Sequence, residues 1–157
     1  MGARILVVDD HEVVREGICR LIEEAGREWV VCGQAGDGAG AITAAMGLRP
    51  DLIVLDVGMP LMDGFQAAVE LLKCGLSCRI LFFTMYDSKS MCAEARRAGV
   101  HGYVLKSDAA RHLVIAIERL LAGGTFFGSL EPEAIAPPDA PPRSGIAFSA
   151  NFSFSSA

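Results

Sequence analysis

Short apolar runs alternate along this chain with longer segments of helical periodicity, and this alternation restricts the possible folds more than any other feature. The run at 52–55 is continuously apolar, which is typical of a strand buried on both faces of a parallel sheet. We predict strands at 4–8, 29–34, 52–55, 79–84 and 100–105, alternating with helices at 12–25, 39–48, 64–73, 88–98 and 109–122. Five strands alternating with five helices predict an α/β fold, a doubly wound parallel sheet with helices on both faces.

Composition places the chain among globular proteins and argues against several partners. Of its 157 residues, 52% are hydrophobic, enough for a sizeable core, and the length favours one domain. The net charge of −5 lacks the basic footprint of a nucleic-acid binder, so we expect no direct nucleic-acid binding. The apolar runs are far shorter than a bilayer span and the N-terminus lacks signal-peptide features, so we expect no membrane contact.

The cysteines indicate the compartment. There are five, an odd number with scattered spacing, which does not suggest a disulfide framework. Cys74 and Cys78 are close enough in sequence to be considered as metal ligands, but no second pair of Cys or His has zinc-like spacing. We interpret all five as reduced thiols and expect a cytoplasmic location.

The composition changes after Gly128. Five of the seven prolines lie between Pro132 and Pro142, and the chain then ends in Ser, Ala, Asn and Phe. We expect a folded domain at 1–128 and, at 129–157, a Pro-rich linker with a disordered Ser/Phe-rich tail. The alternating Phe and Ser leave an edge strand or a partner peptide open as the alternative. With Arg143 as its one basic residue and no helical periodicity, this segment predicts no DNA-binding domain.

Polar residues stand where the predicted strands end. Asp9 and Asp10 follow the first strand, Asp56 the third and Lys106 the fifth, while Thr84 ends the fourth. Because the carboxyl ends of parallel strands gather at one edge, where ligands bind, we expect these side chains to lie together. Carboxylate oxygens suit Mg²⁺, and a carboxylate can act as a nucleophile that becomes an aspartyl phosphate. The pattern predicts Asp56 as acceptor, Lys106 as neutralising charge and Thr84 as a hydroxyl donor to the phosphoryl group.

Each of these residues alone has an ordinary structural explanation. A single Asp after a strand is more often a turn residue or helix cap, and Asp9 with Asp10 could simply cap the following helix. Lys106 alone is typical of a solvated surface lysine, and Tyr103 of a half-buried aromatic with a hydrated hydroxyl. The joint pattern outweighs these explanations because separate strand ends carry the required groups.

Four motifs together resemble the receiver domain of bacterial two-component response regulators, over about residues 3–128. They are Ile-Leu-Val-Val-Asp-Asp-His at 5–11, Asp-Val-Gly-Met-Pro-Leu-Met-Asp-Gly at 56–64, Thr84, and Leu-Lys at 105–106. The stretches 11–17 and 122–127 are similar to the NarL/FixJ group of these regulators.

The resemblance implies a flavodoxin-like fold with strand order 2-1-3-4-5 and a role in phosphorelay signalling. It implies that Asp56 accepts a phosphoryl group from a partner histidine kinase. It also implies that Asp9, Asp10, Asp56 and the backbone carbonyl of Gly58 hold Mg²⁺. The chain would be no enzyme beyond self-phosphorylation from small donors and autodephosphorylation.

The same resemblance implies how the signal leaves the site. Thr84 would move toward the phosphoryl group, the ring of Tyr103 would follow inward, and Lys106 would pair with a phosphoryl oxygen. A protein–protein interaction surface around the fourth helix, fifth strand and fifth helix would then change, and a partner would respond to it.

The chain departs from the family pattern at two positions. Ser107 follows Lys106 where many receivers have a proline in a cis peptide. A cis bond before a non-proline residue costs about 3 kcal/mol, so the loop must be trans or held by its surroundings. Gly58 stands where many relatives carry a polar side chain, so attacking water is neither blocked nor helped by that residue.

Other functions stay open at this level. A phosphorylation-independent adaptor would use a homodimer patch made by Val13 with Leu113, Ile117 and Leu121, although scattered surface apolarity explains these residues equally. The missing helix-turn-helix leaves either a stand-alone receiver or the N-terminal part of a DNA-binding transcriptional regulator. A Mg²⁺ phosphatase of the haloacid dehalogenase type is disfavoured, because it needs a second Asp where this chain has Gly58.

Overall fold

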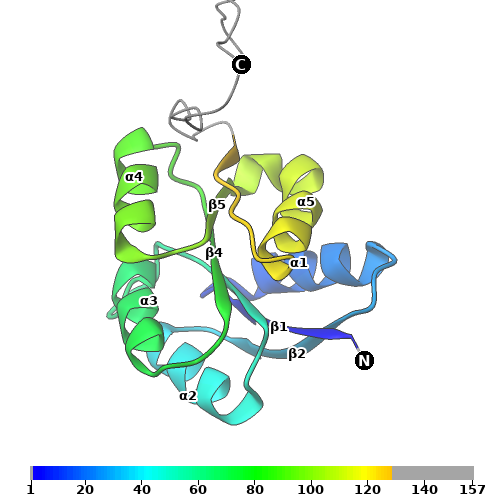
Figure 1. The fold of residues 1–157 in the computed structure, drawn as a ribbon, viewed down its shortest axis with the longest axis horizontal. Coiled ribbons are helices and arrows are strands. Elements are labelled where there is room, and N and C mark those ends of the chain that lie inside the picture. The colour runs from blue at the N-terminus through cyan, green and yellow to red at the C-terminus, as the bar shows by residue number, and fades with distance from the viewer. Residues whose placement is uncertain (1, 129–157) are drawn as a thin grey trace, which may run out of the picture.

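Five parallel strands form one twisted sheet in the order β2-β1-β3-β4-β5 (Figure 1). The computed structural model describes residues 2–128. The strands are β1 Ala3–Val8, β2 Trp29–Ala35, β3 Leu52–Leu55, β4 Arg79–Thr84 and β5 Gly102–Leu105. Every neighbouring pair runs parallel, which confirms the predicted flavodoxin-like sheet.

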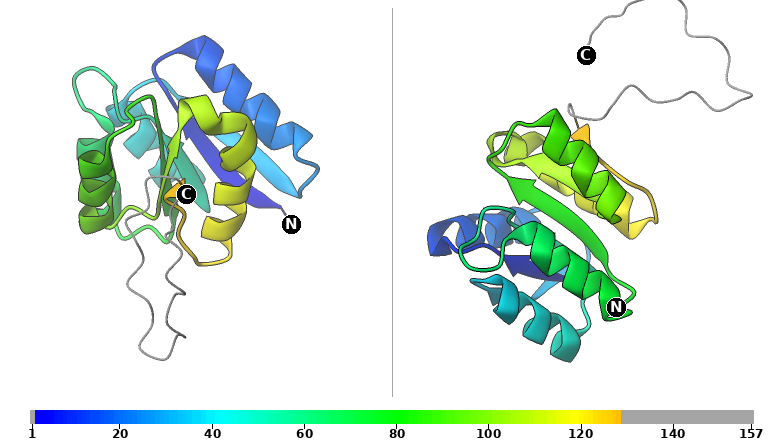
Figure 2. Two further views of the ribbon diagram at one scale, coloured as in Figure 1. Left: turned by 90° about the horizontal axis from the view of Figure 1, so that it is seen from above. Right: turned by 90° about the vertical axis from the view of Figure 1, so that its left-hand side faces the viewer.

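Helices cover both faces of this sheet (Figure 2). They are α1 Glu12–Glu24, α2 Gly38–Leu48, α3 Gly64–Lys73, α4 Lys89–Ala98 and α5 Ala109–Leu121, with a short 3₁₀ turn, η1 Lys106–Asp108, before the last. The apolar side chains of α1 and α5 pack on one face, and those of α2, α3 and α4 pack on the other. The doubly wound arrangement predicted from the alternation is confirmed.

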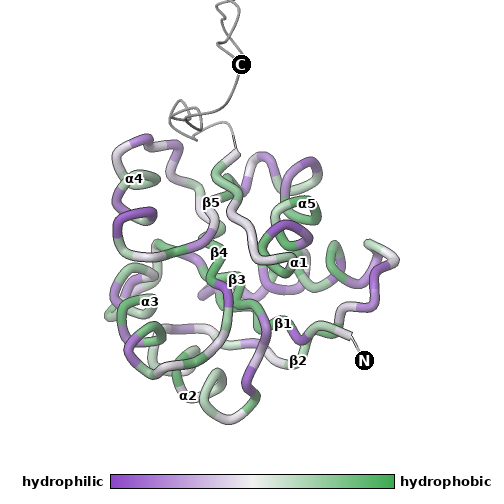
Figure 3. Tube along the Cα trace, in the orientation of Figure 1, coloured by the Kyte–Doolittle hydropathy of each residue, from purple (hydrophilic) through white to green (hydrophobic). Residues whose placement is uncertain are grey.

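Successive residues of the strands enter opposite layers of the core. In β1, Ile5 and Val7 pack toward α1 and α5, whereas Leu6 and Val8 pack toward α2, α3 and α4. The four residues of β3 are all fully buried. The hydropathy colouring shows apolar strands through the middle of the molecule (Figure 3). Burial on both faces explains why these runs are continuously apolar instead of alternating with polar residues.

The loop from β3 to α3 ends in a capping box at the first turn of α3. The Asp63 side chain accepts a hydrogen bond from the Gln66 amide, and the Gln66 side chain accepts one from the Asp63 amide, both at 2.9 Å. This capping box stabilises the first turn of α3. A Cβ on Gly64 would lie 2.5 Å from the Asp56 carbonyl oxygen, so glycine is required where the helix starts beneath the loop.

The start of β5 and the segment after α5 differ from the prediction. β5 begins at Gly102 and not at residue 100, because Gly99 ends α4 with a φ of 94° and the chain must still turn toward the sheet. Beyond α5, Phe126 forms an isolated parallel bridge with Gly102, and its carbonyl accepts a hydrogen bond from the Tyr103 amide at 2.9 Å. A single bridge leaves no periodic signal in a sequence, so this pairing was not predicted.

The apolar band of α5 is mostly core. Leu113 and Ile117 are fully buried, which contradicts their prediction as contacts of a dimer surface. Leu121 is partly buried and packs against the same cluster, whereas Val13 on α1 is 80% exposed. The band is wide because α5 contacts β4, β5 and α1 at once.

Three other expectations are not tied to a single element of the fold. The predicted linker and tail at 129–157 lie outside the described residues. Within 2–128, no helix has both the length and the apolar character needed to cross a membrane. All five cysteines are free thiols, as predicted.

Candidate functional site

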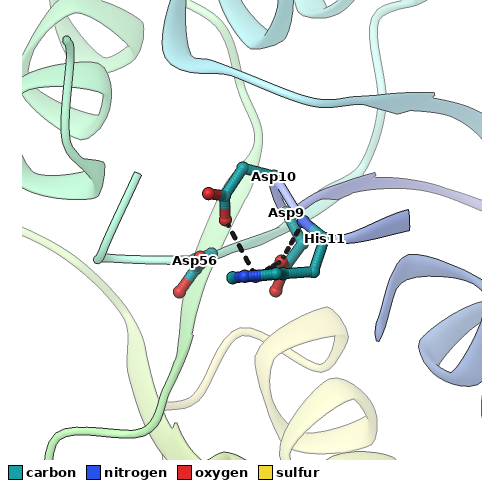
Figure 4. A group of neighbouring side chains, drawn as sticks. All are labelled: Asp9, Asp10, His11 and Asp56. Carbon is teal, nitrogen blue, oxygen red and sulfur yellow. Dashed lines mark hydrogen bonds and ion pairs between the residues drawn. The ribbon is translucent and has the colours of Figure 1, made fainter. Parts of the chain in front are cut away.

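Residues from separate strand ends meet at one edge of the sheet. Asp9 lies directly after β1, Asp56 after β3 and Lys106 after β5. Figure 4 shows Asp9 and Asp56 beside Asp10 and the ring of His11. Parallel strands bring their carboxyl ends together, so residues far apart in the sequence become neighbours here.

Asp9 is completely buried and held on several sides. Its Oδ1 accepts a hydrogen bond from the His11 amide at 2.9 Å, and its Oδ2 lies 2.7 Å from Nζ of Lys106. Its own amide donates to the Ala35 carbonyl at the end of β2, at 3.1 Å. A buried carboxylate is unfavourable unless it is paired, so the Lys106 ammonium is what makes this position tolerable.

Asp56 is 4% exposed, and its surroundings act on the pKa of its carboxyl in opposite directions. Burial raises the pKa of its carboxyl above the usual value, and the neighbouring Asp9 charge raises it further. The Lys106 ammonium, 3.4 Å from Oδ1, and the Gly58 amide, which donates to Oδ1 at 3.3 Å, act in the opposite direction. Two buried carboxylates that share one ammonium leave excess negative charge, which favours the arrival of a cation.

The acidic group fits a divalent cation. Asp9, Asp10, His11 and Asp56 each offer a ligand atom within 4.8 Å of the others. Asp9 Oδ2 and Asp10 Oδ1 are buried, and their partners in the described residues are the Lys106 ammonium at 2.7 Å and the His11 ring at 3.2 Å. Carboxylate oxygens are the ligands that Mg²⁺ prefers, so Asp9, Asp10 and Asp56 suit this ion. The carbonyl of Gly58 as a further ligand stays a prediction.

His11 was not predicted as part of this group. Its Nδ1 lies 3.2 Å from Asp10 Oδ1 and 3.4 Å from Asp9 Oδ1, although 65% of the side chain is exposed. The sequence places it next to the two aspartates, but adjacency in a turn does not determine where a ring points. In the folded chain His11 is the N-cap of α1, and its ring lies beside the aspartates (Figure 4).

Thr84 and Tyr103 are linked through the backbone of Tyr86. Thr84 is fully buried, and its Oγ1 accepts a hydrogen bond from the Tyr86 amide at 3.1 Å. The Tyr103 hydroxyl donates to the Tyr86 carbonyl at 2.7 Å. Tyr103 is 1% exposed, so the half-buried, hydrated alternative is wrong, and burial raises the pKa of its phenol to about 12.

Beside the acidic group lies an open hollow of about 580 Å³, lined by Asp10, Val57, Gly58, Met59, Pro60, Asp63, Phe65, Tyr86 and Met91. A Cβ on Gly58 would lie 3.2 Å from the Tyr86 hydroxyl oxygen, so the tyrosine ring occupies the space beside this glycine. Sequence reasoning missed Tyr86, because nothing along the chain connects it with Gly58.

Comparison with known proteins identifies similar chains. Residues 5–118 match the response regulator receiver domain. The chain is 35% identical over 124 residues to the uncharacterized transcriptional regulatory protein YxjL of Bacillus subtilis, covering 79% of this chain and 56% of that protein. It is 33% identical over 135 residues to the response regulator protein VraR of Staphylococcus epidermidis, covering 86% and 63%. The chain thus spans roughly 60% of the length of these relatives.

Solved structures show the same fold. A two-component response regulator of the LuxR family from Aurantimonas sp. superposes with a TM-score of 0.77 at 38% identity, over 81% of this chain and 90% of that one. The signal receiver domain of the putative response regulator NarL from Mycobacterium tuberculosis gives 0.73 at 33% identity, over 78% and 98%.

Proposed function

This chain belongs to the response regulator receiver domain family, and on that premise we propose that it accepts a phosphoryl group on Asp56 from a partner histidine kinase. The observation that carries the proposal is the environment of Asp56. Its buried carboxylate lies 3.4 Å from Lys106 and within the acidic group formed with Asp9 and Asp10. This combination of an acceptor anion and a cation-binding group suits phosphoryl transfer, which depends on positioning and charge neutralisation.

In the proposed reaction, an Asp56 oxygen forms a bond to phosphorus while the bond from phosphorus to a histidine nitrogen of the kinase breaks. The electron pair of the broken bond stays on that nitrogen, which takes up a proton as the imidazole leaves. Lys106 would turn from its contacts with Asp9 and Asp56 to a phosphoryl oxygen. Mg²⁺ held by Asp9, Asp10 and Asp56 would supply further neutralisation of the phosphoryl charge.

Thr84 and Tyr103 would carry the change outward. The Thr84 hydroxyl would donate to a phosphoryl oxygen while its oxygen keeps the bond from the Tyr86 amide. A shift of Thr84 would therefore pull the backbone that the Tyr103 hydroxyl also holds. The surface formed by α4, β5 and α5 adjoins these residues, so we propose it as the switched interaction surface. We place the exchange in the cytoplasm, in keeping with five free thiols.

The proposal is tested by incubating the chain with a small-molecule phosphodonor and Mg²⁺ and assaying acid-labile phosphate. We expect one phosphoryl group on the wild type and none on Asp56→Ala. Asp63→Ala, at the neighbouring helix cap, serves as the matched control and should still be labelled. No label on the wild type, or label that persists in Asp56→Ala, would contradict the proposal.

A second candidate function is the receiver part of a DNA-binding transcriptional regulator. The relative YxjL is named as a transcriptional regulatory protein, and this chain spans 56% of YxjL and 63% of VraR. Sedimentation with and without phosphodonor tests the remaining adaptor alternative. A dimer that forms only after phosphorylation favours a switched regulator, whereas a dimer indifferent to phosphorylation favours an adaptor.

A further inference from the structure

Arg15 on α1 contacts the acidic site through the backbone of Asp9 and not through its carboxylates. Its Nη1 donates a hydrogen bond to the Asp9 carbonyl at 2.7 Å, and its Nε donates to the Gln34 side-chain oxygen at 3.2 Å. The guanidinium also packs beside Gly36, where an added Cβ would lie 3.4 Å from Nη1. One side chain therefore ties the first turns of α1 to the end of β1 and to β2.

The Asp9 carbonyl belongs to the peptide unit that joins Asp9 to Asp10. Because a peptide unit is planar, fixing this carbonyl also fixes the direction in which the chain enters Asp10. The other groups of Asp9 are held by the Ala35 carbonyl, the His11 amide and the Lys106 ammonium. The bond from Arg15 completes this set, and a charge-assisted hydrogen bond is roughly twice as strong as a neutral one.

The acidic site needs such a restraint. Asp9, Asp10 and Asp56 carry like charges within 4.8 Å of one another, and the partner nearest to Asp10 Oδ1 is the largely exposed His11 ring at 3.2 Å. A free loop would relax by turning the Asp10 carboxylate away from Asp9 and Asp56, because like charges at this distance repel one another. A fixed peptide unit between Asp9 and Asp10 opposes that movement.

We propose that Arg15, oriented by Gln34, is a positioning residue that holds the Asp9–Asp10 peptide so that both carboxylates converge before a cation arrives. The inference deepens the proposed function and rests on it for the identity of the ion as Mg²⁺. Arg15 touches neither the ion nor the phosphoryl group. Its effect is transmitted through the backbone of Asp9.

The test is Mg²⁺ binding by the full chain, measured by calorimetric titration with MgCl₂ and without any phosphodonor. Arg15→Gln should weaken binding about tenfold, since it removes a charge-assisted bond to the loop. Arg15→Lys keeps the charge but loses the planar fork and should fall between the two. Arg20→Gln, an exposed position on the same helix with the same change in charge, should stay within about twofold of wild type.

The control separates position from charge. Equal weakening in Arg15→Gln and Arg20→Gln would show a long-range charge effect and overturn the proposal, as would unchanged binding in Arg15→Gln. Thermal unfolding in EDTA reports on folding of each variant. Should Arg15→Gln unfold early, Gln34→Leu replaces it: this change leaves Arg15 in place, and we expect about threefold weaker binding, with no change overturning the proposal.

Labelling with a phosphodonor keeps the two proposals apart. A wild type that binds Mg²⁺ but takes up no phosphate would end the proposed function and leave the positioning role of Arg15 standing. A wild type labelled on Asp56, together with an Arg15→Gln variant of normal Mg²⁺ affinity, would support the proposed function and overturn the positioning role of Arg15.

Discussion

The two edges of the central sheet use ionisable side chains in different ways. At the amino-terminal edge, the Asp51 carboxylate accepts a hydrogen bond from the Arg4 amide at 2.7 Å. Nearby, Nδ1 of His101 accepts one from the Ile80 amide at 3.0 Å. Each side chain here satisfies a backbone group of a neighbouring strand, so polar residues hold the strands together.

At the carboxyl-terminal edge, like charges are gathered instead. Asp9 and Asp56 share the Lys106 ammonium at 2.7 and 3.4 Å, and Asp10 adds a third carboxylate. Repulsion between these carboxylates is only partly offset by one ammonium, and a bound cation would relieve it. One sheet is therefore stabilised by polar contacts at one edge and carries unrelieved repulsion between like charges at the other.

The largest effect is expected at Gly64, beneath the acidic edge. Gly64→Ala should lower the unfolding free energy by about 3 kcal/mol, because the new Cβ would clash with the backbone at Asp56. Gly47→Ala in α2 is the matched control, since an added Cβ there meets nothing within 4 Å. It should stabilise by up to about 1 kcal/mol. Chemical denaturation measures both, and equal effects would contradict the close approach at Gly64.

The next effect concerns the shared ammonium. Lys106→Met should lower the unfolding free energy by about 2 kcal/mol in EDTA, because two buried carboxylates lose their counter-charge. Lys73→Met, which removes an exposed pair with Glu70 at 3.6 Å, should change it by less than about 0.5 kcal/mol. Denaturant titration compares the two variants, and similar losses would show that the acidic edge is not strained.

Replacing an aspartate by asparagine should change the unfolding free energy by a smaller amount, with opposite signs at the two edges. The raised pKa of Asp56 means that its ionised form is disfavoured in the folded state, so removing the charge at pH 7 should stabilise the protein. We expect Asp56→Asn to raise the unfolding free energy by about 1 kcal/mol in EDTA. Asp51→Asn should lower it by a similar amount, because it weakens the bond to the Arg4 amide. Thermal unfolding measures both variants. Changes of the same sign would contradict the difference proposed between the two edges of the sheet.

The smallest effect is a pH dependence at the amino-terminal edge. Burial, and secondly the Arg79 charge, lower the pKa of His101 below its usual 6.5. The unfolded chain therefore binds this proton first as pH falls, so the stabilisation is complete above about pH 6.5 and is lost as pH falls through the folded pKa. Denaturation at several pH values should show a shallower decline for His101→Gln. Parallel curves would rule out His101 as the source.

Much of this molecule follows from local patterns. The apolar runs predict the strands, most clearly β3, because a strand covered on both faces is apolar at each position. The edge strand β2 is only partly buried and gives a weaker signal, and the short 3₁₀ turn η1 was not predicted. The strand-end residues Asp9, Asp56, Thr84 and Lys106 were predicted to meet, because parallel strands align their carboxyl ends. Their chemical roles, like the switch of Thr84 and Tyr103, remain proposals that labelling and mutation must test.

Other features could not be predicted from the chain alone. Leu113 and Ile117 are core residues because α5 lies against β3, β4 and β5 as well as α1, which the apolar band of one helix cannot reveal. The ring of Tyr86 lies beside Gly58 because the loop after β4 folds over the loop after β3.

The order of the elements, the doubly wound class and the residues that end the strands follow from the sequence alone. They depend on periodicity along the chain and on the fixed direction of parallel strands. Only the tertiary structure decided which atoms meet: Lys106 nearer to Asp9 than to Asp56, Arg15 on the Asp9 carbonyl, and Tyr103 tied to Tyr86. The two kinds of feature differ in the distance along the chain over which their causes act. Periodicity acts over a few neighbouring residues, whereas hydrogen bonds and charges act between segments that only the folded chain brings within a few ångströms.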